Sequence, residues 1–246
     1  MNESAVHGRN AVEEALKQPA RVSRLLLAKE SRAAWVQEIV AQATAGGVRF
    51  DFVPQAKLNQ LTGTHEHQGV VAIVSPVSYV SLTDCLAACP AAATLLALDQ
   101  VQNSKNVGML LRTGAGAGVA GMFLPARGGA LLDEEVVRAS AGAVFHVPVV
   151  NCGNLGQALR ALKEQGFWAY GLDVQGEQDV FRMSWPERVV LVVGNETDGI
   201  SPSVKKACDA LVRIPMAAGQ ESLNVVVAAG IALFQVYAQR MSAGNC

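Results

Sequence analysis

Short apolar runs alternate with amphipathic stretches over the first 75 residues of the chain. The spacing of hydrophobic positions predicts alternating helices and strands, with Pro54 opening one helix and Gly46-Gly47 ending another. The predicted helices cover residues 10–17, 31–44 and 54–61, and the predicted strands cover residues 24–28, 48–53 and 69–74. Proline at position 76 and an alanine-rich segment up to position 93 then interrupt the pattern. We therefore predict a small α/β domain over residues 1–75 and a linker over 76–92.

The rest of the chain repeats a strand followed by a helix. Its strands are short, continuous apolar runs, which is typical of parallel strands buried on both faces. These runs are residues 94–98, 120–124, 167–172, 189–193 and 211–214, and the predicted helices are 106–117, 134–139, 155–164, 202–207 and 222–240. The pattern predicts an α/β domain with a parallel sheet over residues 93–246.

Composition excludes intrinsic disorder, because half of the 246 residues are hydrophobic, 17% are charged and the formal net charge is −1. The longest apolar stretches, residues 86–98 with Pro90 inside and residues 225–234, are shorter than the roughly 20 residues that span a bilayer. Charged residues up to Lys17 leave no signal-peptide core. The balanced charge gives no global basic field for nucleic acid, but it is compatible with a local basic patch. We expect a cytoplasmic protein without a membrane segment.

The five cysteines indicate reduced thiols rather than a metal site or disulfides. Cys85 and Cys89 are four residues apart, but no second pair and no nearby histidine completes a zinc pattern. The remaining cysteines, at positions 152, 208 and 246, are far apart in the sequence. We therefore expect no bound metal.

A glycine pattern near the middle of the chain argues against a dinucleotide site. Gly116, Gly118 and Gly121 match G-x-G-x-x-G, but that motif must follow a strand and open a helix. Here the glycines follow a predicted helix and lead into a predicted strand, which favours a helix C-terminus with close helix–sheet packing. A nucleotide-dependent dehydrogenase is therefore disfavoured.

The first 75 residues hold eight lysines and arginines, seven acids and three of the four histidines. The polar segment Thr62–Gln68 leads directly into a predicted strand, so it forms a loop that is able to present donors to phosphates or bases. A solvated loop beside scattered charges is equally consistent with these residues.

Three polar clusters give a more specific indication of function, because each lies where a predicted strand ends or a predicted helix begins. The first, Asp99–Arg112, follows a buried strand and carries Asn106 and Arg112 on a helix, where an N-cap and a solvent-facing arginine are the simpler interpretations. The second, Gly194–Ser201, contains Glu196 at a strand end, where a glycine permits close approach of a ligand. The third, residues 214–224, leads into the last helix, which Ser222 is suited to cap, with Asn224 in its first turn.

In order and spacing, these clusters resemble the three motifs of the SpoU (TrmH-like) RNA 2′-O-ribose methyltransferases of the SPOUT superfamily. That resemblance implies an α/β catalytic domain that binds S-adenosylmethionine in a deep C-terminal trefoil knot, a rare topology. The segments His7–Val12 and His67–Val70 are similar to the N-terminal substrate-binding module of the bacterial 23S rRNA guanosine-2′-O-methyltransferase (RlmB-like) subgroup. The resemblance covers nearly the whole chain.

The resemblance also implies roles for individual residues. The implied catalytic set is Asn106, Arg112, Glu196, Ser222 and Asn224, and the residues implied to line the S-adenosylmethionine pocket are Gly194, Ile214, Met216 and Leu223. The chain departs from the usual pattern at Lys105, where histidine is common, and at Val226, where a second serine is common. These departures leave the target nucleotide open.

The family proposal makes Arg112 the general base, but a guanidinium with a pKa above 12 is a poor proton acceptor. We therefore expect Arg112 to grip the adjacent phosphate or to stabilise a developing alkoxide. The resemblance further implies a homodimer with the active site shared between two subunits. The expected reaction is methylation of a guanosine ribose in 23S rRNA during ribosome biogenesis. The alternatives are a tRNA ribose methyltransferase, an antibiotic-resistance methyltransferase, and an RNA-binding assembly factor that has lost catalysis.

Overall fold

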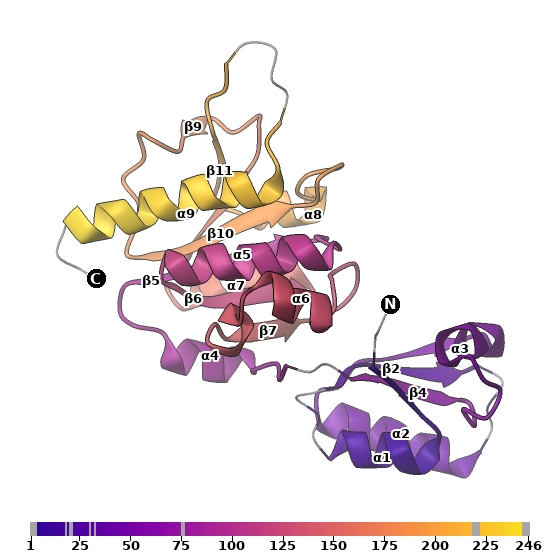
Figure 1. Ribbon diagram of the computed structural model, residues 1–246. Helices are drawn as coiled ribbons and strands as arrows, with labels where there is room; N and C mark the ends of the chain where they lie inside the picture. The colour runs from indigo at the N-terminus through magenta and orange to yellow at the C-terminus, as the bar shows by residue number, and fades with distance from the viewer. Residues whose placement is uncertain are drawn as a thin grey trace. The chain divides into compact units, whose positions relative to one another are not determined.

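The computed structural model describes residues 4–17, 19, 22–29, 31, 33–74, 77–217 and 222–242. The chain divides into two compact units (Figure 1). Unit 1 comprises residues up to Tyr79 together with Leu131–Glu134, and unit 2 comprises Val80–Ala130 and the residues from Glu135 onward.

Unit 1 is a four-stranded sheet in the order β1-β4-β2-β3. The strands are β1 (Ser4–His7), β2 (Val22–Ala28), β3 (Phe50–Val53) and β4 (Val70–Val74), and the helices are α1 (Arg9–Leu16), α2 (Ala34–Ala45) and α3 (Gln55–Thr62). β4 is antiparallel to β1 and β2, whereas β3 is parallel to β2.

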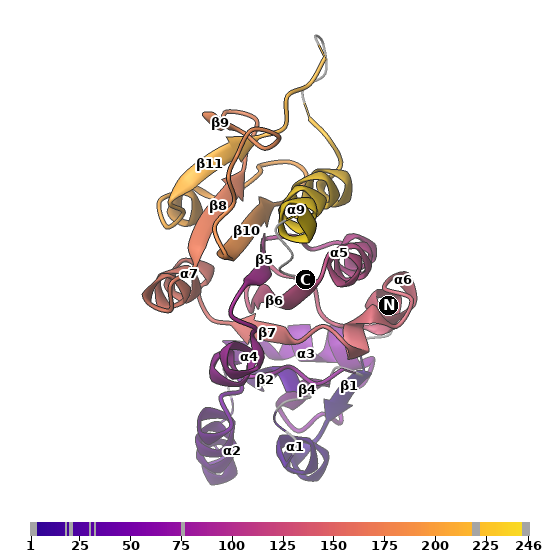
Figure 2. The ribbon, with the colours of Figure 1, turned by 90° about the vertical axis from the view of Figure 1, so that its left-hand side faces the viewer.

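Alternation along β2 builds the two apolar layers of unit 1. Leu25 and Leu27 pack with α1 and α2, while Leu26 and Ala28 pack with Leu58 of α3 on the opposite face. Successive side chains of a strand point to opposite faces, so this single strand anchors both layers. Figure 2 shows α1 and α2 together on one side of the sheet and α3 on the other.

Unit 2 is a seven-stranded sheet in the order β7-β6-β5-β10-β8-β11-β9, and every pairing in it is parallel. Its strands are β5 (Ala93–Asp99), β6 (Val119–Pro125), β7 (Val149–Cys152), β8 (Trp168–Leu172), β9 (Gln178–Asp179), β10 (Arg188–Gly194) and β11 (Ala210–Arg213). The predicted α/β fold with a parallel sheet is confirmed. The trefoil knot stays a prediction, because the connection between β11 and the last helix includes residues 218–221, which lie outside the described residues.

Helices cover both faces of this sheet. They are α4 (Leu82–Ala88), α5 (Ser104–Gly116), α6 (Glu134–Ala139), the short 3-10 helix η2 (Ala143–Phe145), α7 (Leu155–Glu164), α8 (Pro202–Lys205) and α9 (Val225–Ser242). Residues of α4, α7 and α8 share one apolar cluster with the central strands. α9 packs against α5 and β10, and Figure 2 shows α5 and α9 on the side of the sheet opposite α7.

The structure differs from the predicted boundaries in two places. Part of the expected linker 76–92 is helix α4, whose Cys85 is buried against the sheet, and residues 80–92 belong to unit 2. The last helix begins at Val225 rather than at residue 222. Apolar residues on one side of a short helix are enough to dock it, although the flanking prolines and small residues indicated a linker.

The glycine interpretation agrees with the structure. Gly116 ends α5, Gly118 has a φ of +68°, and Gly121 lies in β6, where an added Cβ would come within 2.5 Å of Cys85 Sγ. The four described cysteines are free thiols, and Cys246 lies outside the described residues. These glycines serve packing, as the reversed motif order predicts.

α9 is the one helix in the described part of the chain that is long and apolar enough to cross a membrane. It nevertheless buries Ala229, Leu233 and Val236 within unit 2. Such burial is typical of a core helix of a globular domain. The absence of a membrane segment stays a prediction.

A fully buried histidine holds the loop before β4. His67 is 0% exposed; its Nδ1 accepts a hydrogen bond from the Gly69 amide at 2.9 Å, and its Nε2 lies 2.6 Å from Asn59 Oδ1. An amide N–H can only donate, so Nδ1 is unprotonated and Nε2 donates to Asn59. Burial lowers the pKa of His67 below its ordinary value, and the nearby His7 and His65 lower it further.

Acidification is therefore expected to destabilise unit 1. The neutral His67 stabilises the fold above the ordinary histidine pKa of about 6.5, and this contribution is lost as the pH falls from there toward the lowered pKa of the folded state. Hydrogen-exchange protection of the β4 amides, corrected for intrinsic rates, should fall over that range. His67→Gln should show a weaker pH dependence, and an identical dependence in both proteins would contradict the assignment.

Candidate functional site

Unit 2 contains a pocket where three neighbouring parallel strands end. β8, β10 and β11 contribute their carboxyl ends, and the start of α9 closes the pocket. Its volume is about 360 Å³. Open parallel sheets bind ligands at this edge, so the position and size suit a small organic molecule. The lining residues are Leu172–Gln175, Val193–Gly199, Lys205, Val212, Ile214, Met216, Ser222, Leu223, Val225 and Ala228.

A tight turn after β10 forms one wall of the pocket. The backbones of Asn195 and Gly199 bond to each other in both directions, at 3.2 and 3.1 Å. Asn195 Oδ1 also accepts hydrogen bonds from the amides of Thr197 and Asp198, at 2.9 and 2.6 Å. The turn folds back onto Gly194, where an added Cβ would lie 1.9 Å from the Gly199 carbonyl carbon. Only glycine permits this approach.

A hydrogen bond joins the first and second polar clusters. Asn106 Nδ2 on α5 donates to Glu196 Oε1 in the turn. Asn106 is 9% exposed, and Glu196 lies at the surface and lines the pocket. The N-cap of α5 is Asn103, whose Oδ1 accepts from the Asn106 amide at 3.1 Å. The Asn106 side chain is therefore not a cap, and it orients Glu196.

A buried carboxylate supports the same region. Asp99 ends β5 opposite Gly194 in the parallel register, and its Oδ2 accepts a hydrogen bond from the Ser201 amide at 2.7 Å. The sequence placed Asp99 in the first cluster but gave it no role. Its position at the end of an apolar run was the available signal.

The third cluster splits between the pocket and the helix start. Ile214, Met216, Leu223 and Ser222 line the pocket. Asn224 does not line it; its Oδ1 accepts from the Val226 amide at 2.9 Å and caps the first turn of α9. The expectation that Ser222 caps this helix, with Asn224 inside its first turn, is therefore wrong, because α9 begins one residue after Asn224.

Arg112 lies apart from the pocket. It is exposed on α5 and makes no hydrogen bond or ion pair with any residue in the described ranges. Six positions along a helix turn the side chain by about 240°, so Arg112 and Asn106 occupy different faces of α5. Glu196 and Ser222 line the pocket and Asn106 is hydrogen-bonded to Glu196, whereas Arg112 is not among the lining residues of this chain.

Sequence reasoning missed two charged residues of the pocket. Asp173 directly follows β8, and Lys205 ends α8, and the two side chains form an ion pair of 2.5 Å in the pocket wall. The signal for Asp173 was an acid directly after an apolar run. No group of three His, Cys, Asp or Glu side chains suited to a metal occurs among the residues that the structure describes.

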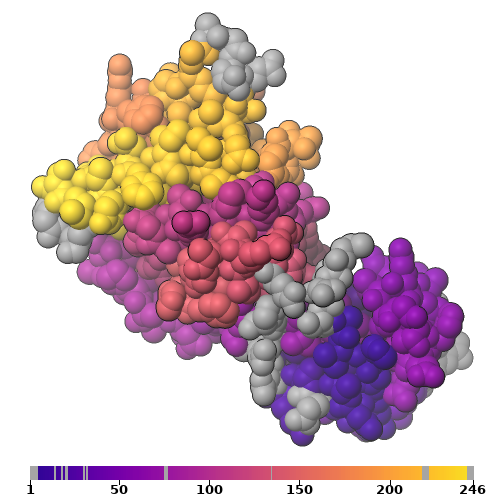
Figure 3. Space-filling model, in the orientation of Figure 1, coloured from indigo at the N-terminus to yellow at the C-terminus, as the bar shows by residue number. Residues whose placement is uncertain are grey.

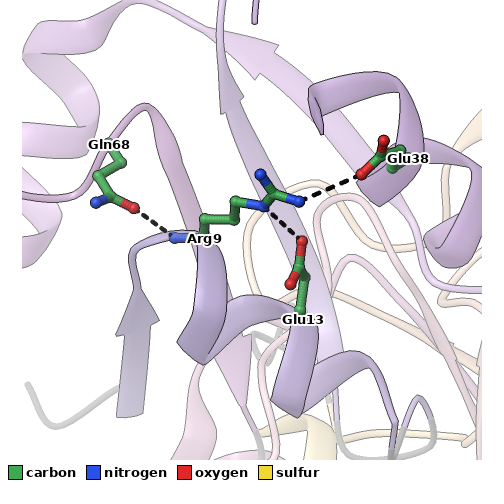
Figure 4. A network of polar contacts seen from close by, with 4 residues as sticks. All are labelled: Arg9, Glu13, Glu38 and Gln68. Carbon is green, nitrogen blue, oxygen red and sulfur yellow. Dashed lines mark hydrogen bonds and ion pairs between the residues drawn. The ribbon is translucent and has the colours of Figure 1, made fainter. Parts of the chain in front are cut away.

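In unit 1, the two motif segments lie side by side. The Arg9 amide donates to Gln68 Oε1 at 2.8 Å, and the Gly8 amide donates to the Val70 carbonyl at 3.2 Å. The Arg9 guanidinium donates to Glu13 at 2.8 Å and to Glu38 at 3.4 Å (Figure 4). The bond to Glu13 raises the pKa of Arg9. This arginine therefore links α1 to α2 and is not a free phosphate ligand.

Each of the two units matches a known family of protein domains. Residues 93–234 match the SpoU rRNA methylase family, and residues 5–80 match the substrate-binding domain of RNA 2′-O ribose methyltransferases. The chain belongs to the SpoU rRNA methylase family.

Individual SpoU relatives align with nearly the entire chain. YacO of Bacillus subtilis, assigned to the TrmH family of tRNA/rRNA methyltransferases, is 35% identical and covers 98% of this chain and 97% of its own length. A TrmH family protein of Staphylococcus saprophyticus is 32% identical and covers 100% and 99%. The crystal structure of the AdoMet-bound rRNA methyltransferase of Sinorhizobium meliloti is 28% identical, with a TM-score of 0.60 and coverage of 97% and 87%.

Gly194→Ala is expected to destabilise this SpoU domain, because the new methyl group meets the backbone of Gly199 and Ile200. Overpacking of this kind costs about 1–3 kcal/mol in the free energy of unfolding. Gly230→Ala is the matched control; its nearest neighbour would be Thr113 Cγ2 at 3.4 Å, and alanine in a helix is favoured by up to about 1 kcal/mol. Urea denaturation measures both, and equal stabilities would contradict the close-approach argument.

Proposed function

We propose that this protein is an S-adenosylmethionine-dependent RNA methyltransferase that modifies a ribose 2′-OH. The observation that carries the proposal is the pocket, because all four residues expected to hold the cofactor, Gly194, Ile214, Met216 and Leu223, line it. The AdoMet-bound state of the Sinorhizobium relative supports the same ligand.

The lining of the pocket fits this cofactor chemically. Val193, Ile214 and Leu223 offer apolar surface for an adenine ring. Glu196 and Asp198 contribute two carboxylates to the same pocket. Carboxylates attract the cationic sulfonium and ammonium groups of S-adenosylmethionine. When bound, the cofactor supplies an electrophilic methyl group.

The side chains of the chain then prepare the ribose hydroxyl. Asn106 holds one oxygen of Glu196, so the carboxylate is fixed where it can accept a proton or a hydroxyl hydrogen bond. Ser222 lines the pocket and orients the ribose of the RNA substrate. Asn224 caps the first turn of α9, which begins directly after Asn224. A guanidinium is a poor proton acceptor, so we assign Arg112 to the neighbouring phosphate or to the developing alkoxide.

A homodimer would bring Arg112 to this pocket. Arg112 is exposed and unpaired among the described residues, so the arginine at each site would come from the second copy. α9 carries Val227, Phe234 and Met241 at seven-residue intervals, each about half exposed. Seven-residue spacing places these side chains along one stripe of the helix. Figure 3 shows α9 (yellow) along the surface beside α5 (magenta), which makes this face a suitable two-fold interface.

We further propose that the substrate is a guanosine ribose in 23S rRNA and that the enzyme acts in the cytoplasm, as an RlmB-like subgroup member. The match of unit 1 to a substrate-binding domain of RNA 2′-O ribose methyltransferases supports an RNA substrate. The alternative is a tRNA ribose, because relatives are assigned to tRNA/rRNA methyltransferases as a group.

Methyl transfer from labelled S-adenosylmethionine to unmodified 23S rRNA, total tRNA and an inert RNA tests the function. We expect one modified guanosine ribose in 23S rRNA, mapped by its block to reverse transcription. Arg112→Ala should lower the rate by about 100-fold or more, as loss of a charge-stabilising donor does. Label in tRNA alone would show that the substrate is tRNA rather than 23S rRNA. Wild-type turnover by Arg112→Lys would overturn the role assigned to the guanidinium. RNA binding without methyl transfer would favour an assembly factor.

Phe234→Glu tests the dimer. Light scattering after size-exclusion chromatography should give a dimer for the wild type and a monomer for the variant, because a charge would be buried in an apolar interface. Phe181→Glu is the matched control, since Phe181 is also about half exposed but lies outside α9. A wild-type monomer at micromolar concentration would contradict the interface.

A further inference from the structure

Asp173 is a carboxylate in the pocket wall whose side chain is only 8% exposed. Its Oδ2 lies 2.5 Å from Lys205 Nζ, and its Oδ1 accepts a hydrogen bond from the Gln175 amide at 2.9 Å. Its own amide donates to the Val212 carbonyl at 2.9 Å, which ties β8 to β11 at this point. Asp173 is therefore held rigidly between two strand ends.

Burial of this charge requires a reason, because removing a carboxylate from water is costly even when a cation pairs with it. The other two carboxylates of the pocket, those of Glu196 and Asp198, belong to exposed residues. One reason for burying Asp173 would be structural: its ion pair with Lys205 would serve as a brace that links β8 to α8. Unit 2 already has such a brace outside the pocket: Asp209 pairs with Lys163 at 2.6 Å and accepts from the Ala169 amide.

We propose that Asp173 recognises the ribose hydroxyls of the adenosine half of the cofactor, with Lys205 as its positioning residue. This inference rests on the proposed function, because it assigns a subsite within the same pocket. An acidic side chain at the end of a parallel strand is a suitable acceptor for ribose hydroxyls. A carboxylate offers about four acceptor positions, and the described donors use two of them. The remaining positions are available to a diol in the pocket.

Lys205 acts through Asp173. Its ammonium group binds one carboxylate oxygen of Asp173, so the free acceptor positions of Asp173 keep a constant direction. Lys205 is the one lysine or arginine among the lining residues in the described part of the chain.

Binding of S-adenosylhomocysteine and of its 2′-deoxy and 3′-deoxy analogues to the full-length protein, measured by calorimetry, tests the proposal. The wild type should prefer the ribose compound over at least one analogue by about tenfold or more, the typical effect of a hydrogen bond to a charged group. Asp173→Asn should weaken binding of the ribose compound by a similar factor. The ratio of the dissociation constants of the deoxy and ribose compounds should then be close to one. Asp209→Asn, the matched control, should keep both the affinity and the preference.

Each other outcome is decisive as well. A preference that survives Asp173→Asn, or an equal loss of affinity in Asp173→Asn and Asp209→Asn, would show that the pair is a brace and overturn the inference. Wild-type protein that binds the ribose and deoxy compounds equally would overturn it too, and the proposed function would stand. If the wild-type protein binds neither S-adenosylhomocysteine nor its deoxy analogues, the assignment of S-adenosylmethionine as the cofactor would be overturned as well.

Lys205→Gln separates positioning from direct contact. The variant keeps the Asp173 carboxylate, so the preference for the ribose compound should persist while its affinity falls severalfold. Should Asp173→Asn fail to fold, a crystal structure of the wild type with S-adenosylhomocysteine decides. A ribose hydroxyl within about 3 Å of an Asp173 carboxylate oxygen supports the assignment, and a ribose that contacts only backbone groups overturns it.

Discussion

The parallel pairing of β5 with β10 is the constraint on which the candidate site depends. Its register sets Asp99 opposite Gly194, so two strand ends meet at one edge of the sheet. From there Asp99 binds the Ser201 amide, and Asn106 reaches Glu196. A shift by one residue would turn every side chain of β10 to the opposite face and separate these partners. The apolar core of unit 2 therefore positions the polar residues above it.

Much of this arrangement follows from short-range patterns. The apolar runs predicted the parallel sheet. Gly194 ends β10, and Ile214 and Met216 follow β11, which places all three at the pocket. The patterns could not show which polar side chain turns inward. Asp173 lies in the pocket wall, and its ion-pair partner Lys205 comes 32 positions later in the chain. Asn224 and Ser222 differ in role because α9 begins directly after Asn224, which caps its first turn, whereas Ser222 lies two residues earlier and lines the pocket.

Unit 1 illustrates the same limit on a smaller scale. Its two motif segments were recognisable, and their hydrogen-bonded contact follows from the pairing of β1 with β4. Glu13 lies four residues after Arg9 on the same helix, a spacing at which such pairs form, but Glu38 was not predictable as a partner because it lies on a different helix. The Arg9 guanidinium, bonded to one carboxylate on α1 and one on α2, thus connects the two helices that cover the same face of the sheet.

The turn after β10 has a kinetic consequence. The backbone and the side chain of Asn195 both bond to backbone groups of its own turn, so this wall of the pocket is ordered before any ligand arrives. A ligand that meets a preorganised wall loses little free energy in ordering it. Entry and departure then require no refolding of this segment. Exchange of spent for fresh cofactor would be governed by the contacts themselves, and the residence time of the product would report on those contacts directly.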